Sequence, residues 1–214
     1  MSDKLVEYSF YLTYAFLVTT GTITFIESMR TKNDSMRHIL NLETCISIVA
    51  AFFYGKFVTE FDKPTIDYKS INLNRYVDWS ITTPIMLLVL ILAFRYNTDK
   101  KAQVKFTDFI MILVLNYGML GTGYMGDIGK LARIPATIFG FIFFGGLYYF
   151  LYSFVKNEPN NKLLYSVFFI LWSLYGVFYL MEEQSRNIGY NVLDLFSKCF
   201  VGIYFWAYFT KIFN

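Results

Sequence analysis

Apolar residues fill seven stretches of this chain, each long enough to cross the hydrocarbon core of a lipid bilayer, which takes roughly 20 helical residues. We expect membrane-spanning helices near residues 7–28, 36–58, 71–95, 104–124, 130–155, 162–183 and 189–213. The connections between these stretches are mostly short. The pattern therefore predicts an all-α fold, a seven-helix transmembrane bundle that forms a single domain over residues 1–214.

Composition agrees with this pattern, because 56% of the residues are hydrophobic, 21% are aromatic and only 16% are charged. The loops assigned to the cytoplasmic side hold more lysine and arginine than the outer loops, which favours an N-terminus outside and a C-terminus in the cytoplasm. The net charge of +3 gives no indication of a nucleic-acid partner. We expect an integral multi-pass membrane protein that is not an enzyme and has no metal site.

Few ionisable residues fall inside the predicted helices, and such residues are usually functional. They are Glu27, Glu43, Arg75, Asp78, Asp194 and Lys198. Lys198 lies deep in the last stretch, one turn after Asp194, where a charged amine costs about 2.5–3.5 kcal/mol to insert. Desolvation favours the neutral, nucleophilic amine, which suits condensation with a carbonyl. A buried Lys–Asp pair that only joins two helices is an equal alternative on this segment alone.

Helical spacing groups several of the other side chains. Arg75 and Asp78 are three residues apart and share one face of the third helix, and Thr82 continues that face one turn further. Three aromatic residues form a stripe on the sixth helix: Trp172, Tyr175 and Tyr179. Such a stripe is more often ordinary core than a ligand wall, although with Trp79 on the third helix it suits a long, flat, conjugated ligand.

These segments resemble the microbial (type 1) rhodopsins, the bacteriorhodopsin-like proteins. Residues 75–84, with the sequence RYVDWSITTP, resemble the third-helix signature of that family. Asp194 and Lys198 resemble the retinal-attachment motif of its seventh helix. The aromatic stripe resembles the sixth-helix wall of its retinal pocket, and residues 116–123 resemble the fourth-helix segment that lies near the retinal ring.

The resemblance implies that Lys198 carries all-trans retinal, bound covalently as a protonated Schiff base. Asp78 would be the main counterion and the first proton acceptor, and Asp194 would be the second counterion. Arg75 would be the gate charge on the outer side. The side chains that would line the retinal pocket are Trp79, Thr82, Thr83, Asn116, Met119, Gly123, Trp172, Tyr175 and Tyr179.

The chain departs from the proton pumps of this family on the third and sixth helices. Val89 stands where the pumps carry the acid that returns a proton to the Schiff base. Gly176 replaces a proline, and Tyr179 stands where a tryptophan is common. Glu182 and Glu183 cannot be matched to the paired glutamates of the release group. These departures argue against efficient pumping by the usual route.

Glu43 on the second helix offers a substitute for the missing proton donor. We place it about 10 Å from the cytoplasmic end of that helix, at 1.5 Å per residue, and at the depth of Trp206. The hypothesis is that Glu43 is protonated in the dark, hydrogen-bonded near the Trp206 indole, and acts as the internal donor. A neutral polar tie to a neighbouring helix or protomer is the alternative.

The short chain, its basic first loop and the second-helix glutamate are most similar to the viral rhodopsins of the second group, which giant viruses encode. This resemblance implies a homopentamer in the host cell membrane, with Glu27 and Arg37 near a central pore. An outward proton pump is favoured by Asp78 and Glu43. A light-gated ion channel and a sensory rhodopsin with a separate transducer remain open, as does a retinal-free transporter with a structural Lys–Asp pair.

Overall fold

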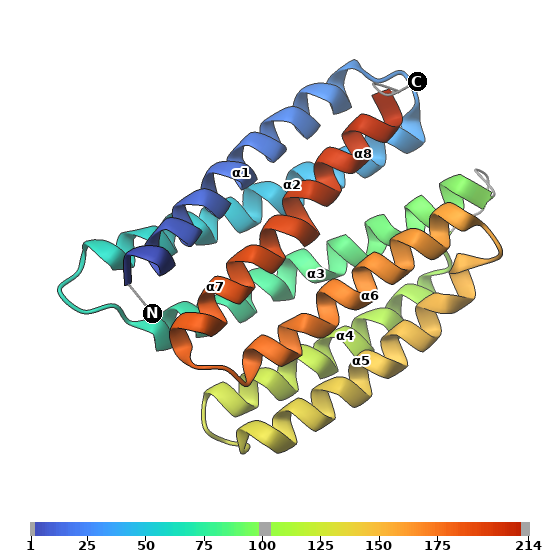
Figure 1. Ribbon diagram of the computed structural model, residues 1–214. Coiled ribbons are helices and arrows are strands. Elements are labelled where there is room, and N and C mark those ends of the chain that lie inside the picture. The colour runs from blue at the N-terminus through green and yellow to red at the C-terminus, as the bar shows by residue number, and fades with distance from the viewer. Residues whose placement is uncertain (1–2, 99–103, 211–214) are drawn as a thin grey trace. The chain divides into compact units, whose positions relative to one another are not determined.

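The computed structural model describes residues 3–98 and 104–210, and these residues form helices joined by short turns (Figure 1). The α-helices are α1 (Asp3–Arg30), α2 (Asp34–Val58), α3 (Tyr68–Thr98), α4 (Phe106–Asp127), α5 (Arg133–Val155), α6 (Pro159–Tyr179), α7 (Glu183–Asp194) and α8 (Val201–Thr210). A 3-10 turn η1 (Thr59–Asp62) follows α2, and a π-helix η2 (Leu195–Phe200) joins α7 to α8. Seven helical runs are long and apolar enough to cross a membrane, which confirms the predicted fold class.

Two helices in the middle of the chain have bounds that differ from the approximate ranges expected from the sequence. The stretch 130–155 was expected to be helical throughout, but α5 begins at Arg133 because Gly129 has a φ of 75° and turns the chain before it. The next helix was expected near residues 162–183, but α6 lies three to four residues earlier, from Pro159 to Tyr179. Proline at the first helical position has a φ already suited to a helix and lacks only an N–H that would be unpaired there.

The last helical run begins earlier than the apolar pattern indicated. Residues 183–188 are mostly polar and were left outside the predicted stretch 189–213, yet α7 begins at Glu183. Arg186 and Asn187 are buried there, and Arg186 Nε donates to the Tyr190 hydroxyl at 3.1 Å. Polar side chains with partners inside the protein can therefore continue a membrane helix. Residues 211–213 of the predicted stretch lie outside the described residues.

The chain divides into two compact units. Unit 1 comprises Met1–Ile71 and Glu182–Asn214, and so contains α1, α2, η1, α7, η2, α8 and the first residues of α3. Unit 2 comprises Asn72–Met181 and contains the rest of α3 with α4, α5 and α6. The single domain over residues 1–214 stays a prediction.

In unit 1, α1 packs along α2, and the continuous run of α7, η2 and α8 lies against α1 (Figure 1). The core of this unit is aromatic near the start of α1. The ring of Phe10 lies 6.0 Å from that of Phe57 and 5.9 Å from that of Tyr54. This packing fixes Tyr54, whose hydroxyl reaches α7.

In unit 2, α4 packs on α5 and α5 packs on α6. Asn161 joins three helices of this unit. Its amide nitrogen donates to the carbonyl oxygens of Phe94 at 3.0 Å and Val155 at 3.1 Å, and its amide oxygen accepts from Asn97 at 2.8 Å. Because Asn161 is fully buried, these bonds satisfy an amide that would otherwise be costly inside the protein.

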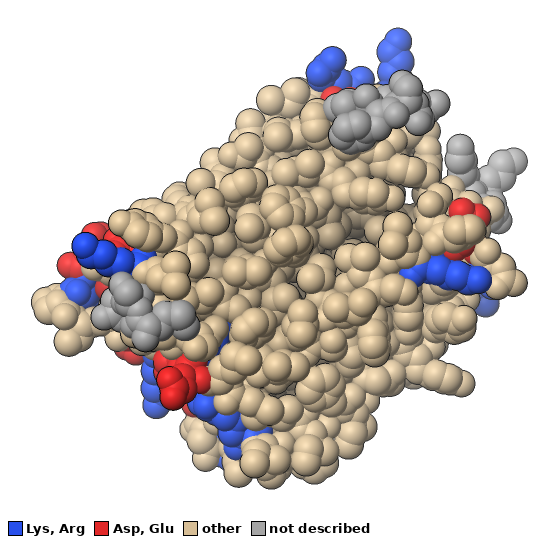
Figure 2. Space-filling view, viewed as in Figure 1, with Lys and Arg blue, Asp and Glu red and all other residues tan. Residues whose placement is uncertain are grey.

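The sides of the helices are apolar, and their ends carry the charges. In the space-filling view, Lys, Arg, Asp and Glu gather near the helix ends, and the surface along the helices is formed by other residues (Figure 2). Large apolar side chains are exposed there, including Val114 at 57%, Ile142 at 63% and Ile170 at 57%. Such an apolar surface requires an apolar solvent, as the hydrocarbon of a bilayer provides.

Candidate functional site

Lys198 and Asp194 form a buried ion pair in unit 1. The Lys198 Nζ lies 3.4 Å from Asp194 Oδ1, one helical turn away, and the exposed fractions of the two side chains are 1% and 0%. A pair of opposite charges taken out of water is held only by close geometry and further hydrogen bonds. The structure thus brings together the two residues that the spacing in the last stretch singled out.

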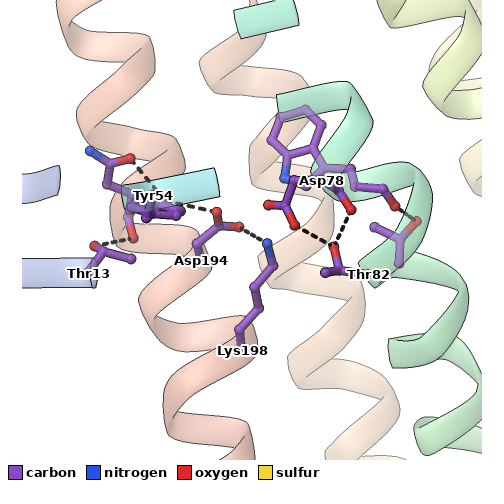
Figure 3. A network of polar contacts seen from close by, with 9 residues as sticks. Thr13, Tyr54, Asp78, Thr82, Asp194 and Lys198 are labelled. Atoms are coloured by element: carbon purple, nitrogen blue, oxygen red, sulfur yellow. Dashed lines mark hydrogen bonds and ion pairs between the residues drawn. The ribbon is translucent and has the colours of Figure 1, made fainter. Parts of the chain in front are cut away.

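Asp194 accepts a further hydrogen bond from a residue that the sequence did not indicate. Figure 3 shows the Tyr54 hydroxyl directed at Asp194, and this hydroxyl donates to Asp194 Oδ2 at 2.9 Å. Asn191 Oδ1, at 3.0 Å, is a second acceptor for the same hydroxyl. Asn191 is held in turn, because Thr13 Oγ1 donates to its carbonyl oxygen and its amide donates to Ser9 Oγ. Asp194 is therefore fixed in orientation by α2 and, through Asn191, by α1.

Lys198 lies inside the π-helix η2, another feature that the apolar pattern did not predict. A π-helix bonds each N–H five residues back, so its turn is wider than that of an α-helix, and such turns are frequent at functional sites. Ser197, Lys198 and Cys199 are the buried residues of η2. The local geometry therefore sets Lys198 apart from an ordinary helix residue.

Glu43 is buried in unit 1, at 2% exposure. Its Oε2 has no hydrogen-bond partner among the described residues, and a Cβ built on Gly202 would lie 3.2 Å from that oxygen. The predicted hydrogen bond to the Trp206 indole does not occur within the described residues. Glu43 borders α8 one turn earlier, at Gly202, because a glycine there leaves room for the carboxyl group.

Asp78 and Thr82 come together on α3 in unit 2, and both are fully buried. Thr82 Oγ1 lies 2.9 Å from the Asp78 carbonyl oxygen and 3.3 Å from Asp78 Oδ1 (Figure 3). This is the spacing of one turn that the sequence predicted. Arg75, one turn earlier on α3, is also fully buried.

Aromatic rings from α3, α5 and α6 pack together in unit 2. The Trp79 ring meets Tyr175 edge to face at 5.6 Å, and it meets Tyr76 at 5.4 Å. Trp172 packs against Tyr148 at 6.4 Å. Edge-to-face pairs hold ring planes at fixed angles, so the predicted aromatic residues offer rigid apolar surfaces.

The predicted residues of α4 contact α3 and α6. Asn116 Nδ2 donates to Thr83 Oγ1 at 2.9 Å, and the Tyr179 hydroxyl donates to the Gly123 carbonyl oxygen at 3.2 Å. Met119 is half-buried on α4. A bond that the sequence did not indicate also joins α3 to α4, because the Tyr76 hydroxyl donates to Asp127 Oδ2 at 2.8 Å.

The sequence is similar to light-absorbing membrane proteins of microbes. It is 26% identical over 221 residues to a green-light absorbing proteorhodopsin from Gamma-proteobacterium EBAC31A08, an alignment that covers 92% of this chain and 84% of that protein. It is 26% identical over 214 residues to a bacteriorhodopsin from Haloterrigena sp. (strain arg-4), covering 87% of this chain and 81% of that protein.

Solved structures give the same result. The crystal structure of viral rhodopsin OLPVRII superposes with a TM-score of 0.95 at 68% identity, covering 98% of this chain and 100% of that one. A blue light-absorbing proteorhodopsin from Med12, at 21% identity and a TM-score of 0.78, shares the fold over 97% of this chain and 98% of its own. The family of bacteriorhodopsin-like proteins matches residues 4–212. This chain therefore belongs to the bacteriorhodopsin-like family, the microbial rhodopsins.

Proposed function

We propose that this chain binds all-trans retinal covalently through Lys198 Nζ and works as a light-driven outward proton pump, with Asp78 as the proton acceptor. Members of its family bind retinal through a lysine. The observation that carries the proposal is the buried Lys198 amine beside Asp194. Bound retinal would supply the absorption of visible light and a photoisomerisation that reorients the N–H bond at the Lys198 nitrogen.

The described residues of each unit suit this chromophore. In unit 1, Asp194 balances a positive charge at the Lys198 nitrogen, whether that nitrogen is an ammonium or a protonated imine. In unit 2, the rings of Trp79, Trp172 and Tyr175 present flat apolar surface of the kind that a conjugated chain packs against. Neither set requires a metal ion or a second cofactor.

We assign the two aspartates different roles. Asp194 accepts from the Tyr54 hydroxyl at 2.9 Å and lies beside the Lys198 amine, so we assign it the role of a fixed counterion. Asp78 shares a longer bond of 3.3 Å with the Thr82 hydroxyl. Because that hydroxyl can also donate to the Asp78 carbonyl oxygen at 2.9 Å, it can release the carboxylate when a proton arrives.

Glu43 is the internal donor in this proposal, the group that returns a proton to the Lys198 nitrogen. Val89 on α3 is fully buried and has no proton to give. Glu43 is a carboxyl group buried in the same unit as Lys198. A buried carboxyl group without a charged partner favours its neutral, protonated form, which is the form that a donor needs before the light reaction.

Light-driven pH change in liposomes tests the pump. We expect illuminated liposomes that contain the protein with retinal to change the external pH at zero membrane potential, and a protonophore to abolish the change. Asp78→Asn should remove the signal and keep a visible absorption band, whereas Lys198→Ala should give a colourless protein. Current that flows only along an imposed ion gradient would instead identify a channel, and stable intermediates without transport would favour a sensor.

A further inference from the structure

Glu43 lies in a polar region of unit 1 whose geometry suits proton transfer. A Cβ built on Gly202 would lie 2.8 Å from Thr20 Cγ2, 3.2 Å from Glu43 Oε2 and 3.8 Å from Thr24 Cγ2, so the Glu43 carboxyl and the methyl groups of Thr20 and Thr24 border the same space at this glycine. Ser47, one turn from Glu43 on α2, is buried, and its Oγ has no hydrogen-bond partner within residues 3–98 and 104–210. Buried oxygens of this kind are usually satisfied by ordered water.

The hydroxyls of Thr24 and Thr44 join α1 to α2. Their Oγ1 atoms are 2.9 Å apart, and both residues are buried. Thr24 Oγ1 also lies 2.9 Å from the Thr20 carbonyl oxygen. Thr44 Oγ1 lies 2.8 Å from the Leu40 carbonyl oxygen. Thr24 Oγ1 also has a longer contact of 3.2 Å with the Gly21 carbonyl oxygen, so the pair has four contacts available.

Two hydroxyls hold two hydrogens, so they donate at most two hydrogen bonds among these four contacts at any moment. Thr24 donates to its own helix and accepts from Thr44, or Thr44 donates to its own helix and accepts from Thr24. The two arrangements use contacts of nearly equal length. Rotation about the Cβ–Oγ bonds of both threonines redirects the two hydroxyl hydrogens and converts one arrangement into the other. A proton relay requires a pair of hydroxyls whose donor and acceptor roles can be exchanged at a small cost in free energy.

We propose that the Thr24–Thr44 hydroxyl pair, with bridging water, is the relay through which Glu43 takes up its proton; this rests on the donor role proposed for Glu43. The path runs from the end of unit 1 where α1 ends at Arg30 and α2 begins at Asp34. Ser28 lies one turn beyond Thr24 in that direction and is buried. At each oxygen one proton arrives and one leaves, so every hydroxyl ends with a single hydrogen.

Isotope exchange of the Glu43 carboxyl proton in the dark tests the relay without any light reaction. The C=O stretch of the protonated carboxyl is followed by infrared spectroscopy after transfer to D2O, and its loss in Glu43→Gln assigns the band. We expect Thr24→Val and Thr44→Val to slow the exchange by about tenfold or more, because each removes a buried hydrogen-bonding step. Thr24→Ser, which keeps the hydroxyl, should restore the wild-type rate.

Thr22→Val is the matched control. Thr22 also donates to a carbonyl oxygen four residues back on α1, at 2.8 Å, but its hydroxyl is exposed, so the exchange rate should not change. If the hydroxyl pair only joined α1 to α2, its loss would loosen the packing of these two helices. The exchange of the Glu43 carboxyl proton would then become faster in the valine variants, not slower. Unchanged or faster exchange in both valine variants, or the absence of a protonated Glu43 band in the wild type, overturns the proposal.

A separate measurement tests whether Glu43 is the proton donor. It is the rate at which the deprotonated photocycle intermediate recovers in Glu43→Gln. Unchanged recovery there removes the donor role from the proposed function. Slow dark exchange in the valine variants still supports Thr24 and Thr44 as the path by which Glu43 exchanges its proton.

Discussion

At the scale of single residues, the chemistry of unit 1 depends on how Asp194 is held. A polar side chain inside the protein needs hydrogen-bond donors and an oppositely charged partner close by. Here the cation is Lys198, and the Tyr54 hydroxyl donates at 2.9 Å. This arrangement holds the Asp194 carboxyl group in position beside the Lys198 nitrogen.

Tyr54→Phe should therefore destabilise the protein and shift its visible absorption. The change removes the hydroxyl that donates to Asp194 and leaves a buried carboxylate with one donor fewer, at a cost of about 1–3 kcal/mol. Thermal unfolding followed by loss of the visible band measures this cost. Tyr14→Phe is the control, because the Tyr14 ring lies on α1 beside Gly55. Equal Tm and absorption in the two variants would contradict the role given to Tyr54.

Spacing within a helix made part of this site predictable. Asp194 with Lys198, and Asp78 with Thr82, are each four residues apart, so the sequence alone places each pair on one helix face. Tyr54 could not be found this way, because it lies 140 positions from Asp194 and becomes its partner only when α2 packs beside α7. A tyrosine among many aromatic residues gives no signal of its own.

At the scale of elements, the seven helical runs were predictable and their ends were not. A run of apolar residues longer than 18 has few alternatives to a membrane helix. Helix ends depend instead on local backbone conformation, such as the positive φ of Gly129, and on buried polar partners, such as Tyr190 for Arg186. Hydropathy does not report either feature.

Two glycines of α4 should respond oppositely to the same substitution. A Cβ at Gly126 would clash with the Tyr179 hydroxyl and lie 2.9 Å from Ala136 Cβ, so Gly126→Ala should cost about 1–3 kcal/mol. Gly121 has no neighbouring atom within 4 Å of such a Cβ. Gly121→Ala should stabilise the helix by roughly 0.5–1 kcal/mol. Thermal unfolding in one detergent compares them, and a Gly126 variant as stable as the Gly121 variant would refute the predicted clash.

At the scale of the whole molecule, the chain is an integral multi-pass membrane protein, and its orientation remains a prediction from loop charges. The N-terminus-outside orientation places Lys63 outside and Lys32 inside. In a background with Cys45 and Cys199 replaced by alanine, a membrane-impermeant maleimide should label Lys63→Cys in intact cells. Lys32→Cys should react only after the membrane is opened. Labelling in the reverse order would invert the orientation and, with it, the proposed direction of pumping.

The π-helix η2 has a consequence for the helical run that contains it. A π turn needs one residue more than an α turn to close its hydrogen bond, and each residue of a helix advances the direction of its side chain by about 100°. The additional residue therefore sets the angular phase between Lys198 and α8. If the chain were one residue shorter after Lys198, Ile203 would fall where Gly202 lies, and its side chain would occupy the space that the Glu43 carboxyl borders. The π turn thus keeps Lys198 and the glycine that borders the Glu43 carboxyl in register along one helical run.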